Sequence, residues 1–311
     1  MYKVGVSIGD VNGIAPEILL KSHQIIKKFC TPIYCAHQEL LEKISEILKI
    51  PLAKDMIFIP PNAPIPMIHI GKIQEDSGFY SFKSFEKACE LAEKNEADFI
   101  TTLPIHKFAW KCAKINFVGH TEYLSHRYKK EGIMMLGCEE MFVALFSDHI
   151  PLKSVSNKIT KKNLLEFLKN FYHCTKEENI AVLGLNPHCG DNGLIGNEDF
   201  IIKESIDKIN KILNKEIFKG PFPADSAFSP PMREKYKIFI ALYHDIGLAP
   251  LKALHFYESI NITLNIPILR TSVDHGVGFD IAYQNKATTQ SYINAILLGK
   301  KFKEKNEQSR L

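Results

Sequence analysis

The sequence predicts an α/β protein built around mainly parallel β-sheets covered by helices. Short apolar, β-rich runs alternate with amphipathic helical stretches along all 311 residues. Polar clusters fall where the apolar runs end, as expected at the carboxyl ends of parallel strands. The length corresponds to about two domains or one large α/β unit. A hydrophobic content of 45% is enough for a full core.

The first third of the chain opens on a strand. YKVGVSI (2–8) is β-rich and ends in the turn GDVNG (9–13), and the pattern over 17–29 has helical spacing. The patterns that follow predict a strand at 32–37, a helix at 39–50, a proline-rich connection at 60–66, a helix at 81–97 and a strand at 98–104.

The second half continues the alternation. The patterns predict strands at 179–187 and 236–245, a strand pair at 261–272, and helices at 199–213 and 288–302. YHDIGLAPLK (243–252) is expected to be a loop, because Gly247 and Pro250 interrupt it. Sites form in such loops at the strand ends.

Charge and cysteine content exclude several classes of protein. The formal net charge of +4 is too mild for a nucleic-acid-binding protein. No apolar run approaches the ~20 residues that a membrane span needs, and no N-terminal signal is visible. Seven scattered cysteines without a CxxC pair indicate reduced thiols, mostly in the core, in a cytoplasmic protein.

Three histidines share a context that suits a metal. His149, His188 and His244 each lie at or just past a β-rich run, beside Pro, Gly or Asp. Neutral imidazoles bind zinc and similar ions, and three protein ligands leave a position open for substrate. The spacing alone leaves the alternative that each is a hydrogen-bonded loop or core residue.

Basic and polar residues farther along predict an anion site. Lys252, Asn261 and Arg270 are spaced by nine residues, and arginine is a bidentate donor for phosphate or carboxylate. VGHTEYL (118–124) places His120 and Thr121 just ahead of a helix, where backbone N–H groups bind anions. Thr121 as a simple helix cap is the alternative.

Seven segments together resemble the 4-hydroxythreonine-4-phosphate dehydrogenase family of pyridoxal phosphate biosynthesis. They run in the family's order over nearly the whole chain: GDVNGIAPEI (9–18), VGHTEYL (118–124), DHIPL (148–152), LNPHCGDNGLIGNED (185–199), GPFPADSAF (220–228), YHDIGLAPLK (243–252) and ILRTSVDHGVGFDIA (268–282).

The resemblance implies a fold, an activity and site residues. The fold would be two α/β/α domains with a cleft between them, similar to isocitrate and isopropylmalate dehydrogenases, with boundaries near 1–117 plus 281–311 and 118–280. The second domain would carry most of the metal and substrate residues. The activity would be oxidation and decarboxylation of 4-phosphooxy-L-threonine with NAD or NADP and a divalent metal (zinc, magnesium or cobalt), in a homodimer whose active site lies at the interface.

The resemblance also assigns roles to residues. His149, His188 and His244 match metal ligands, and His120, Thr121, Lys252, Asn261 and Arg270 match substrate-binding positions. Asp245, Lys252 and Asp225 are the candidate general bases. Without a GxGxxG fingerprint, we expect the nicotinamide site among the loops at 186–193, 220–226 and 274–280.

Several positions depart from the family's usual residues. Val11-Asn12 stands where Pro-Ala is usual, and Val277, Gly278 and Tyr283 also differ. Ile246 stands where the family usually has Gln, Ala15 stands where Gly is common, and Cys189 stands where Ala is usual. Cys189 is either a fourth metal ligand or a small residue tolerated beside His188.

Three alternative functions fit parts of the same pattern. The first is a paralogue that oxidises another phosphorylated hydroxy acid. The second is a non-redox metal-dependent hydrolase or lyase that uses the same histidines. The third is a non-catalytic metal- or phosphate-binding protein.

Overall fold

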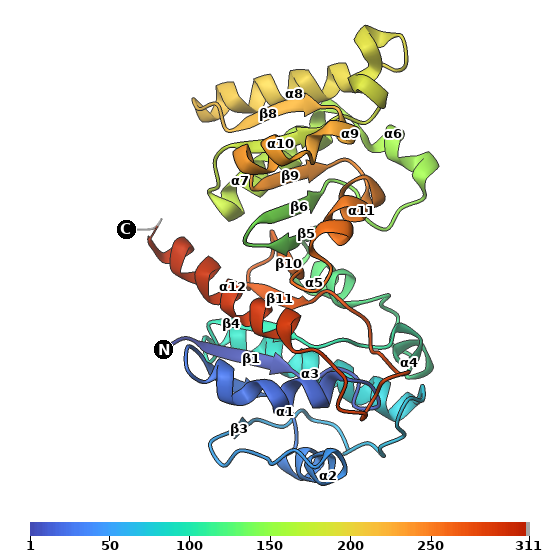
Figure 1. Ribbon diagram of the computed structural model, residues 1–311, viewed down its shortest axis with the longest axis vertical. Helices are drawn as coiled ribbons and strands as arrows, with labels where there is room; N and C mark the ends of the chain where they lie inside the picture. The colour runs from blue at the N-terminus through green and yellow to red at the C-terminus, as the bar shows by residue number, and fades with distance from the viewer. Residues whose placement is uncertain (309–311) are drawn as a thin grey trace. The chain divides into compact units, whose positions relative to one another are not determined.

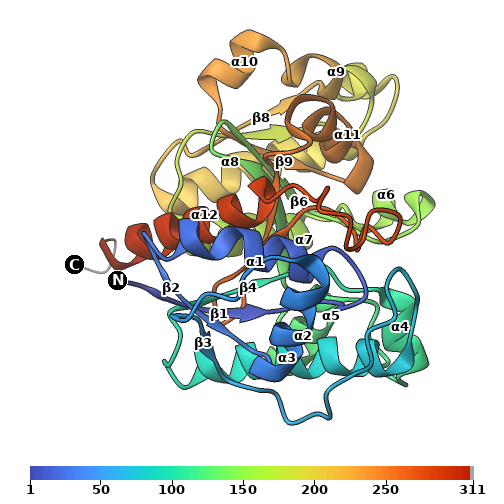
Figure 2. The ribbon, with the colours of Figure 1, turned by 60° about the horizontal axis from the view of Figure 1, so that its bottom comes forward.

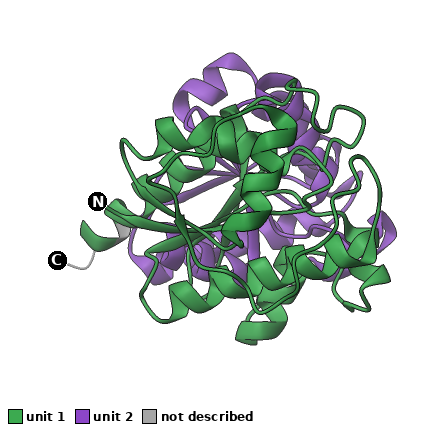
Figure 3. Ribbon diagram, turned by 90° about the horizontal axis from the view of Figure 1, so that it is seen from below, with its two compact units in different colours: residues 1–132, 260–311 green, residues 133–259 purple. Residues whose placement is uncertain are grey.

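The alternation of strands and helices produces an α/β fold, as predicted. The computed structural model describes residues 1–308, and Figures 1 and 2 show it from two sides. The chain forms two units, which Figure 3 distinguishes by colour: unit 1 combines Met1–Gly132 with Ile260–Leu311, and unit 2 is Ile133–Ser259. No helix among residues 1–308 has the length and apolar character to cross a bilayer.

Unit 1 is built from two separate segments of the chain. Its elements are β1 (Lys3–Ser7), α1 (Ala15–Ile26), β2 (Thr31–Tyr34), α2 (Gln38–Leu48), β3 (Ile57–Phe58), α3 (Glu75–Glu93), β4 (Phe99–Thr102), α4 (Lys107–Cys112), α5 (His120–Tyr128), β10 (Ile260–Leu264), β11 (Arg270–Val273) and α12 (Gln290–Gln308).

The sheet of unit 1 has the strand order β3-β2-β1-β4-β11-β10 and is parallel except for the β10–β11 hairpin. Its two faces carry different cores. Val4 and Val6 of β1 belong to the core that contains residues of α1, α2 and α12. On the other face, Gly5 lies against Ala88 of α3. Side chains alternate along a strand, so Ser7 points to the α3 face as well.

Unit 2 is also built from strands that alternate with helices. Its elements are β5 (Ile133–Cys138), β6 (Met141–Leu145), η1 (Leu152–Ser154), α6 (Val155–Lys158), α7 (Lys161–Thr175), β7 (Ile180–Leu183), η2 (Pro187–Gly193), α8 (Glu198–Leu213), β8 (Phe218–Phe222), α9 (Ala224–Ala227), α10 (Pro230–Lys235), β9 (Ile238–Ala241) and α11 (His244–His255). The strand order is β5-β6-β9-β7-β8, with β5 and β6 antiparallel and the rest parallel.

The unit boundaries lie elsewhere than near 117 and 280, where the motifs had placed them. Tyr123 of α5 packs edge-on against Phe82 and Phe85 of α3, with ring centroids 5.1 and 5.3 Å apart. Strand β11 pairs with β4 in the middle of the unit 1 sheet. These contacts hold 118–132 and 260–280 in unit 1, so His120, Thr121, Asn261 and Arg270 lie there and not with the histidines.

The prediction that 243–252 is a loop was wrong. Residues His244–His255 form helix α11, with Pro250 inside it. Gly247 faces the sheet: a Cβ there would lie 2.5 Å from Val143 Cγ1 and 2.6 Å from Ala241 Cβ. The glycine is therefore a close-packing residue that lets α11 lie against β6 and β9, and not a helix terminator.

All seven cysteines are free thiols, as predicted. Cys30, Cys35, Cys89 and Cys138 are buried, which fits small core residues. The other three, which include Cys189 in η2, are partly exposed.

Candidate functional site

Two of the three predicted metal ligands lie next to each other in unit 2. The rings of His149, in the loop after β6, and His244, the first residue of α11, have centroids 5.6 Å apart. His244 Nδ1 is hydrogen-bonded to Asp245 Oδ1 at 2.7 Å, and His149 Nδ1 lies 3.8 Å from Asp148 Oδ2. A carboxylate at Nδ1 fixes the tautomer that leaves Nε2 free for a metal.

Helix α11 places the charged residues of YHDIGLAPLK along one side. Asp245 and Lys252 are seven residues apart, which is close to two full turns, so their side chains project from nearly the same face, ~10 Å apart along the axis. Asp245 is exposed and His244 is partly exposed. The Lys252 Nζ lies 5.4 Å from the centre of the Phe256 ring.

His188 lies in a separate, strained turn of unit 2. It begins a run of six residues with positive φ, which continues through Cys189, Gly190, Asp191, Asn192 and Gly193. The left-handed conformation costs roughly 1–2 kcal/mol for each ordinary residue, so the surrounding structure must hold the turn in place. Strain of this kind is typical of functional loops.

Asp199 of α8 holds the approach to that turn. Its carboxylate accepts hydrogen bonds from the backbone N–H groups of Leu185 and Asn186, at 2.9 and 3.1 Å, and from the Asn186 side chain at 2.9 Å. Gly184 is required beside it, since a Cβ there would lie 2.7 Å from both the Asp199 carboxylate and the Cys189 Sγ. The segment LNPHCGDNG is thereby fixed, with His188 on its exposed side.

The structure does not bring all three histidines into one cluster. Among residues 1–308, His149, His188 and His244 are not a group whose ligand atoms all lie within 4.8 Å of one another. Cys189, which follows His188, faces Gly184 and Asp199, and burial raises the pKa of its thiol to about 11. Asp225 in α9, another candidate base, is exposed and adds to that rise.

Unit 1 carries a row of polar side chains across four strands. By register, Ser7 of β1 pairs with Thr102 of β4, Thr102 with Ser272 of β11, and Ser272 with Asn261 of β10. Paired residues in a sheet point to the same face, which here is the α3 face. Ser7 Oγ and Asn261 Oδ1, at the two ends of the row, are buried without a hydrogen-bond partner among the described residues. Buried polar atoms rarely stay unpaired, so the row suits a polar ligand.

Arg270 lies beside this row, on the same face. It is 3% exposed, and its guanidinium donates to Thr102 Oγ1 at 2.8 and 3.2 Å and to Thr263 Oγ1 at 3.0 Å. Burial lowers the pKa of Arg270 to about 9, which leaves it a cation at neutral pH. Within residues 1–308, no carboxylate pairs with it. A buried cation whose hydrogen bonds go only to hydroxyls is chemically suited to an anionic ligand.

His120 and Thr121 are the first two residues of α5. The helix cap is Gly119, so Thr121 is not the cap that the alternative interpretation required. The His120 ring packs edge-on against Phe85 and Trp110, and its Nε2 is buried with no hydrogen-bond partner among residues 1–308. Burial, reinforced by the Arg270 charge, lowers the pKa of His120 well below its usual value. A neutral imidazole therefore faces the same region as the Arg270 cation.

Several polar residues of unit 1 were missed at the level of sequence. Ser7, Thr102 and Thr263 were read only as parts of apolar strands, and Asp10 as part of a turn. Asp10 is fully buried, its Oδ2 has no partner within residues 1–308, and burial raises its pKa. The sequence feature that could have indicated them is a hydroxyl residue inside a short apolar strand, such as the two threonines of FITT (99–102).

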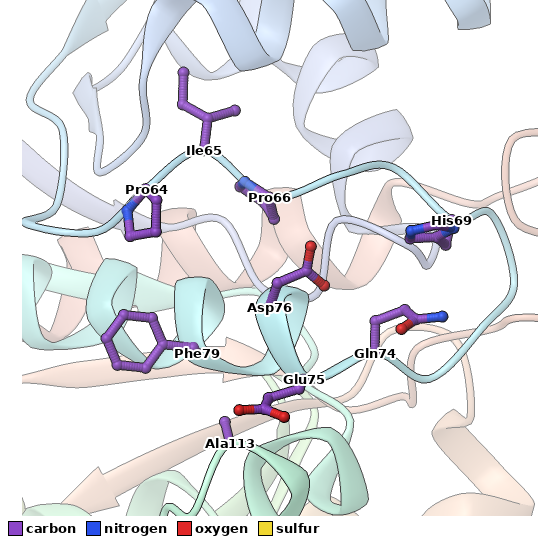
Figure 4. A pocket seen from close by; sticks show the side chains of 9 residues that line it. All are labelled: Pro64, Ile65, Pro66, His69, Gln74, Glu75, Asp76, Phe79 and Ala113. Atoms are coloured by element: carbon purple, nitrogen blue, oxygen red, sulfur yellow. The ribbon is translucent and has the colours of Figure 1, made fainter.

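A pocket of about 420 Å³ lies elsewhere in unit 1, between the proline-rich connection and the start of α3 (Figure 4). Pro64, Pro66 and Phe79 line it together with Glu75 and Asp76. Two carboxylates repel a phosphorylated substrate, so the pocket is distinct from the anion site at Arg270. None of the predicted site residues lines it.

With both residue groups placed, comparison with known proteins identifies the family. Residues 28–299 match the family described as "Pyridoxal phosphate biosynthetic protein PdxA". The chain belongs to this family. The family that the seven motifs indicated is thus confirmed.

Individual relatives cover nearly the whole chain. A 4-hydroxythreonine-4-phosphate dehydrogenase of Helicobacter pylori strain J99 is 50% identical over 299 residues, which are 94% of this chain and 97% of that protein. One from Sulfurimonas denitrificans is 50% identical over 296 residues, 94% and 95% of the two chains. The crystal structure of the Klebsiella pneumoniae enzyme of the same name matches with a TM-score of 0.83 at 29% identity, over 97% of this chain and 98% of that one. The predicted α/β fold class is confirmed by this match, while the likeness to isocitrate dehydrogenases stays a prediction.

Proposed function

We propose that this member of the PdxA family oxidises and decarboxylates 4-phosphooxy-L-threonine to 3-amino-2-oxopropyl phosphate, with NAD or NADP and a divalent metal. The observation that carries the proposal is Arg270, a buried cation without a carboxylate partner among the described residues. The unpartnered Asn261 Oδ1 and the neutral His120 support a polar, anionic ligand beside it. The names of the 50%-identical relatives agree with this substrate.

The metal would be held by His149, His188 and His244. The hydrogen bond between His244 Nδ1 and the Asp245 carboxylate supports this role, because it leaves His244 Nε2 available to a metal, and Asp148 lies 3.8 Å from His149 Nδ1. An all-imidazole ligand set favours zinc or cobalt over magnesium, which prefers oxygen ligands. When bound, the metal and the nicotinamide supply Lewis-acid activation of a hydroxyl and a hydride acceptor.

The chain's own residues would bind the substrate and move protons. Arg270 presents a planar donor to the phosphate, and Asn261 and His120 supply further hydrogen bonds. Oxidation of the C3 hydroxyl requires one base to take its proton, and loss of CO2 then requires a proton at the carbon that carried the carboxylate. Lys252, Asp245 and Asp225 are the candidates; both aspartates are exposed and Lys252 is partly exposed.

We further infer a cytoplasmic homodimer in which both chains contribute to each site. The position of His188, outside any three-histidine cluster in a single chain, supports this inference. The nicotinamide would bind among the loops at 186–193, 220–226 and 274–280. The first of these holds the run of six positive-φ residues, and backbone strain of this kind is typical of functional loops.

The decisive experiment is formation of NADH or NADPH from 4-phosphooxy-L-threonine by the purified protein. We expect turnover that a chelator abolishes and added zinc or cobalt restores. His244→Ala should lose at least a hundredfold in rate, because a missing ligand costs more than the 10–100-fold typical of an outer-shell partner. His173→Ala, which removes an exposed histidine of α7, is the matched control and should keep full activity.

Other outcomes would redirect the proposal. Reduction of NAD with a different phosphorylated hydroxy acid, and none with this substrate, would show a paralogue of altered specificity. Chelator-sensitive cleavage without any nicotinamide reduction would show a hydrolase or lyase. Full activity of His244→Ala would remove the histidine site from the mechanism.

A further inference from the structure

Unit 2 holds a second group of metal-binding side chains, away from the three histidines above. Cys138 ends strand β5, Glu140 lies in the tight turn to β6, and His255 ends helix α11. One ligand atom from each lies within 4.8 Å of the other two. Among residues 1–308, no other three His, Cys, Asp or Glu side chains bring their ligand atoms this close together.

The burial of the three side chains suits a site at the edge of the fold. Cys138 is 2% exposed, His255 is partly buried and Glu140 is exposed. The His255 Nε2 atom is fully buried and has no hydrogen-bond partner among the described residues. An unpaired buried imidazole nitrogen is destabilising, and a bound cation would offset that cost.

From this geometry we propose that Cys138, Glu140 and His255 bind a divalent ion of the zinc class, with water as a fourth ligand on the exposed side. A sulfur, a nitrogen and a carboxylate oxygen form a donor set that zinc accepts in tetrahedral sites. With metal–ligand distances of about 2.0–2.3 Å, the donor atoms must approach to roughly 3.5 Å. The exposed Glu140 side chain has the freedom to make that adjustment.

Cys138 is an unreactive thiol in the metal-free protein. Its thiol is hydrogen-bonded to the Glu140 carboxylate, and burial, followed by this bond, raises its pKa to about 11. A thiol in that state is a poor nucleophile. A cation between the two groups reverses the effect, because the thiol proton leaves to solvent as the metal–sulfur bond forms.

The ion would fasten the end of α11 to the β5–β6 turn. Helix α11 begins at His244 and carries Lys252, so the clip would fix the helix that presents two residues of the proposed active site. The metal site itself does not depend on the proposed function, because its ligands are eleven or more residues from His244 along the chain or on other elements.

The test is titration of the metal-free protein with Co²⁺ alone, followed by near-ultraviolet absorption. A thiolate–cobalt bond gives an intense charge-transfer band, whereas histidine and carboxylate ligands do not. We expect the band to appear in the wild type and to be lost in Cys138→Ser. Exposed Glu140→Gln, which should not disturb folding, and His255→Gln should weaken Co²⁺ binding by roughly 100-fold or more.

Two cysteine variants make the assignment specific. Cys112→Ser removes a partly exposed thiol of unit 1, and Cys189→Ala removes the thiol beside His188; both should keep the band. Zn²⁺ should also raise the Tm of the wild type more than that of Glu140→Gln. Absence of the band in the wild type, or its loss in Cys189→Ala with retention in Cys138→Ser, would overturn the proposal.

Discussion

The hydroxyl of Tyr283 donates a 2.8 Å hydrogen bond to the backbone carbonyl of Val11. Both residues depart from those usual in the family. Val277, a further departure, contacts the same turn through its backbone: its carbonyl accepts the N–H of Ile14 at 2.9 Å, and a Cβ on Gly13 would lie 2.4 Å from that oxygen. The unusual residues at 277 and 283 therefore both pack against the segment at 11–14.

Asn12, another departure, provides the first prediction. Its side chain accepts from the His69 N–H at 2.7 Å and donates to the Lys72 carbonyl at 3.1 Å, and it is fully buried. Asn12→Ala restores the residue usual in the family but leaves both groups unpaired. We expect the free energy of unfolding to fall by about 1–3 kcal/mol, measured by urea denaturation. Asn62→Ala, at an exposed position, should change little; equal stability of both variants would contradict the structural role.

The sequence was sufficient for the alternation of elements but not for the role of its glycines. Gly247 was expected to interrupt a loop, yet it lies inside helix α11, and Gly78, which precedes the helix predicted at 81–97, lies inside α3. A Cβ on Gly78 would lie 2.3 Å from the Ala109 carbonyl. Each glycine lets its helix approach a neighbour, and only the packed structure distinguishes this from a helix end. Helix α3 accordingly begins at Glu75, six residues before the predicted start.

The candidate site was predictable as residue types but not as an arrangement. Arg270 and Asn261 stood out as basic and polar residues at strand ends. The threonines that hold Arg270 did not, because Thr102 and Thr263 lie within apolar strands and their contacts depend on register. The division of the site residues between two units likewise follows from pairing between β4 and β11, which are far apart in sequence.

Gly247 gives a direct test of the packing of α11. Gly247→Ala gains up to ~1 kcal/mol in helix propensity but forces a methyl group into Val143 and Ala241. We expect a net loss of roughly 1–2 kcal/mol in the free energy of unfolding. Gly276→Ala is the matched control, since nothing lies within 4 Å of its Cβ position. A more stable Gly247→Ala protein would show that α11 does not approach the sheet this closely.

Arg270 should show opposite effects on stability and activity. Its buried charge has no carboxylate partner within residues 1–308, so Arg270→Met should leave the Tm unchanged or raise it. The same change should raise KM for the phosphorylated substrate by about 10–100-fold, because a hydrogen bond to a charged group contributes ~1.5–3 kcal/mol. Arg127→Met removes an arginine paired with Glu93 and should leave KM unchanged. A sharp fall in Tm for Arg270→Met, with KM preserved, would make Arg270 structural.

Asp245 should act through His244 and not as the base. The hydrogen bond that its carboxylate accepts from His244 Nδ1–H sets the imidazole tautomer. Asp245→Asn should lower the affinity for zinc by about 10–100-fold, measured with a competing chelator, and saturating zinc should restore most of kcat. Lys252→Ala should do the reverse, with metal affinity kept and kcat lost. If excess zinc fails to restore Asp245→Asn, the carboxylate itself takes part in proton transfer.

His120 should make stability depend on pH. Burial first, then the charges of Arg270 and Lys107, lower the pKa of His120 in the folded state. The unfolded chain therefore binds an extra proton below its pKa of about 6.5, and folding stability falls as pH drops through that value. The slope approaches ~1.4 kcal/mol per pH unit for one proton. His120→Asn should make the free energy of unfolding depend less on pH between pH 7 and pH 5. The smaller dependence that remains would come from His23, because burial lowers the pKa of that residue as well. Exposed His173→Asn should follow the wild-type profile, and an unchanged slope in His120→Asn would mean that His120 is protonated in the fold.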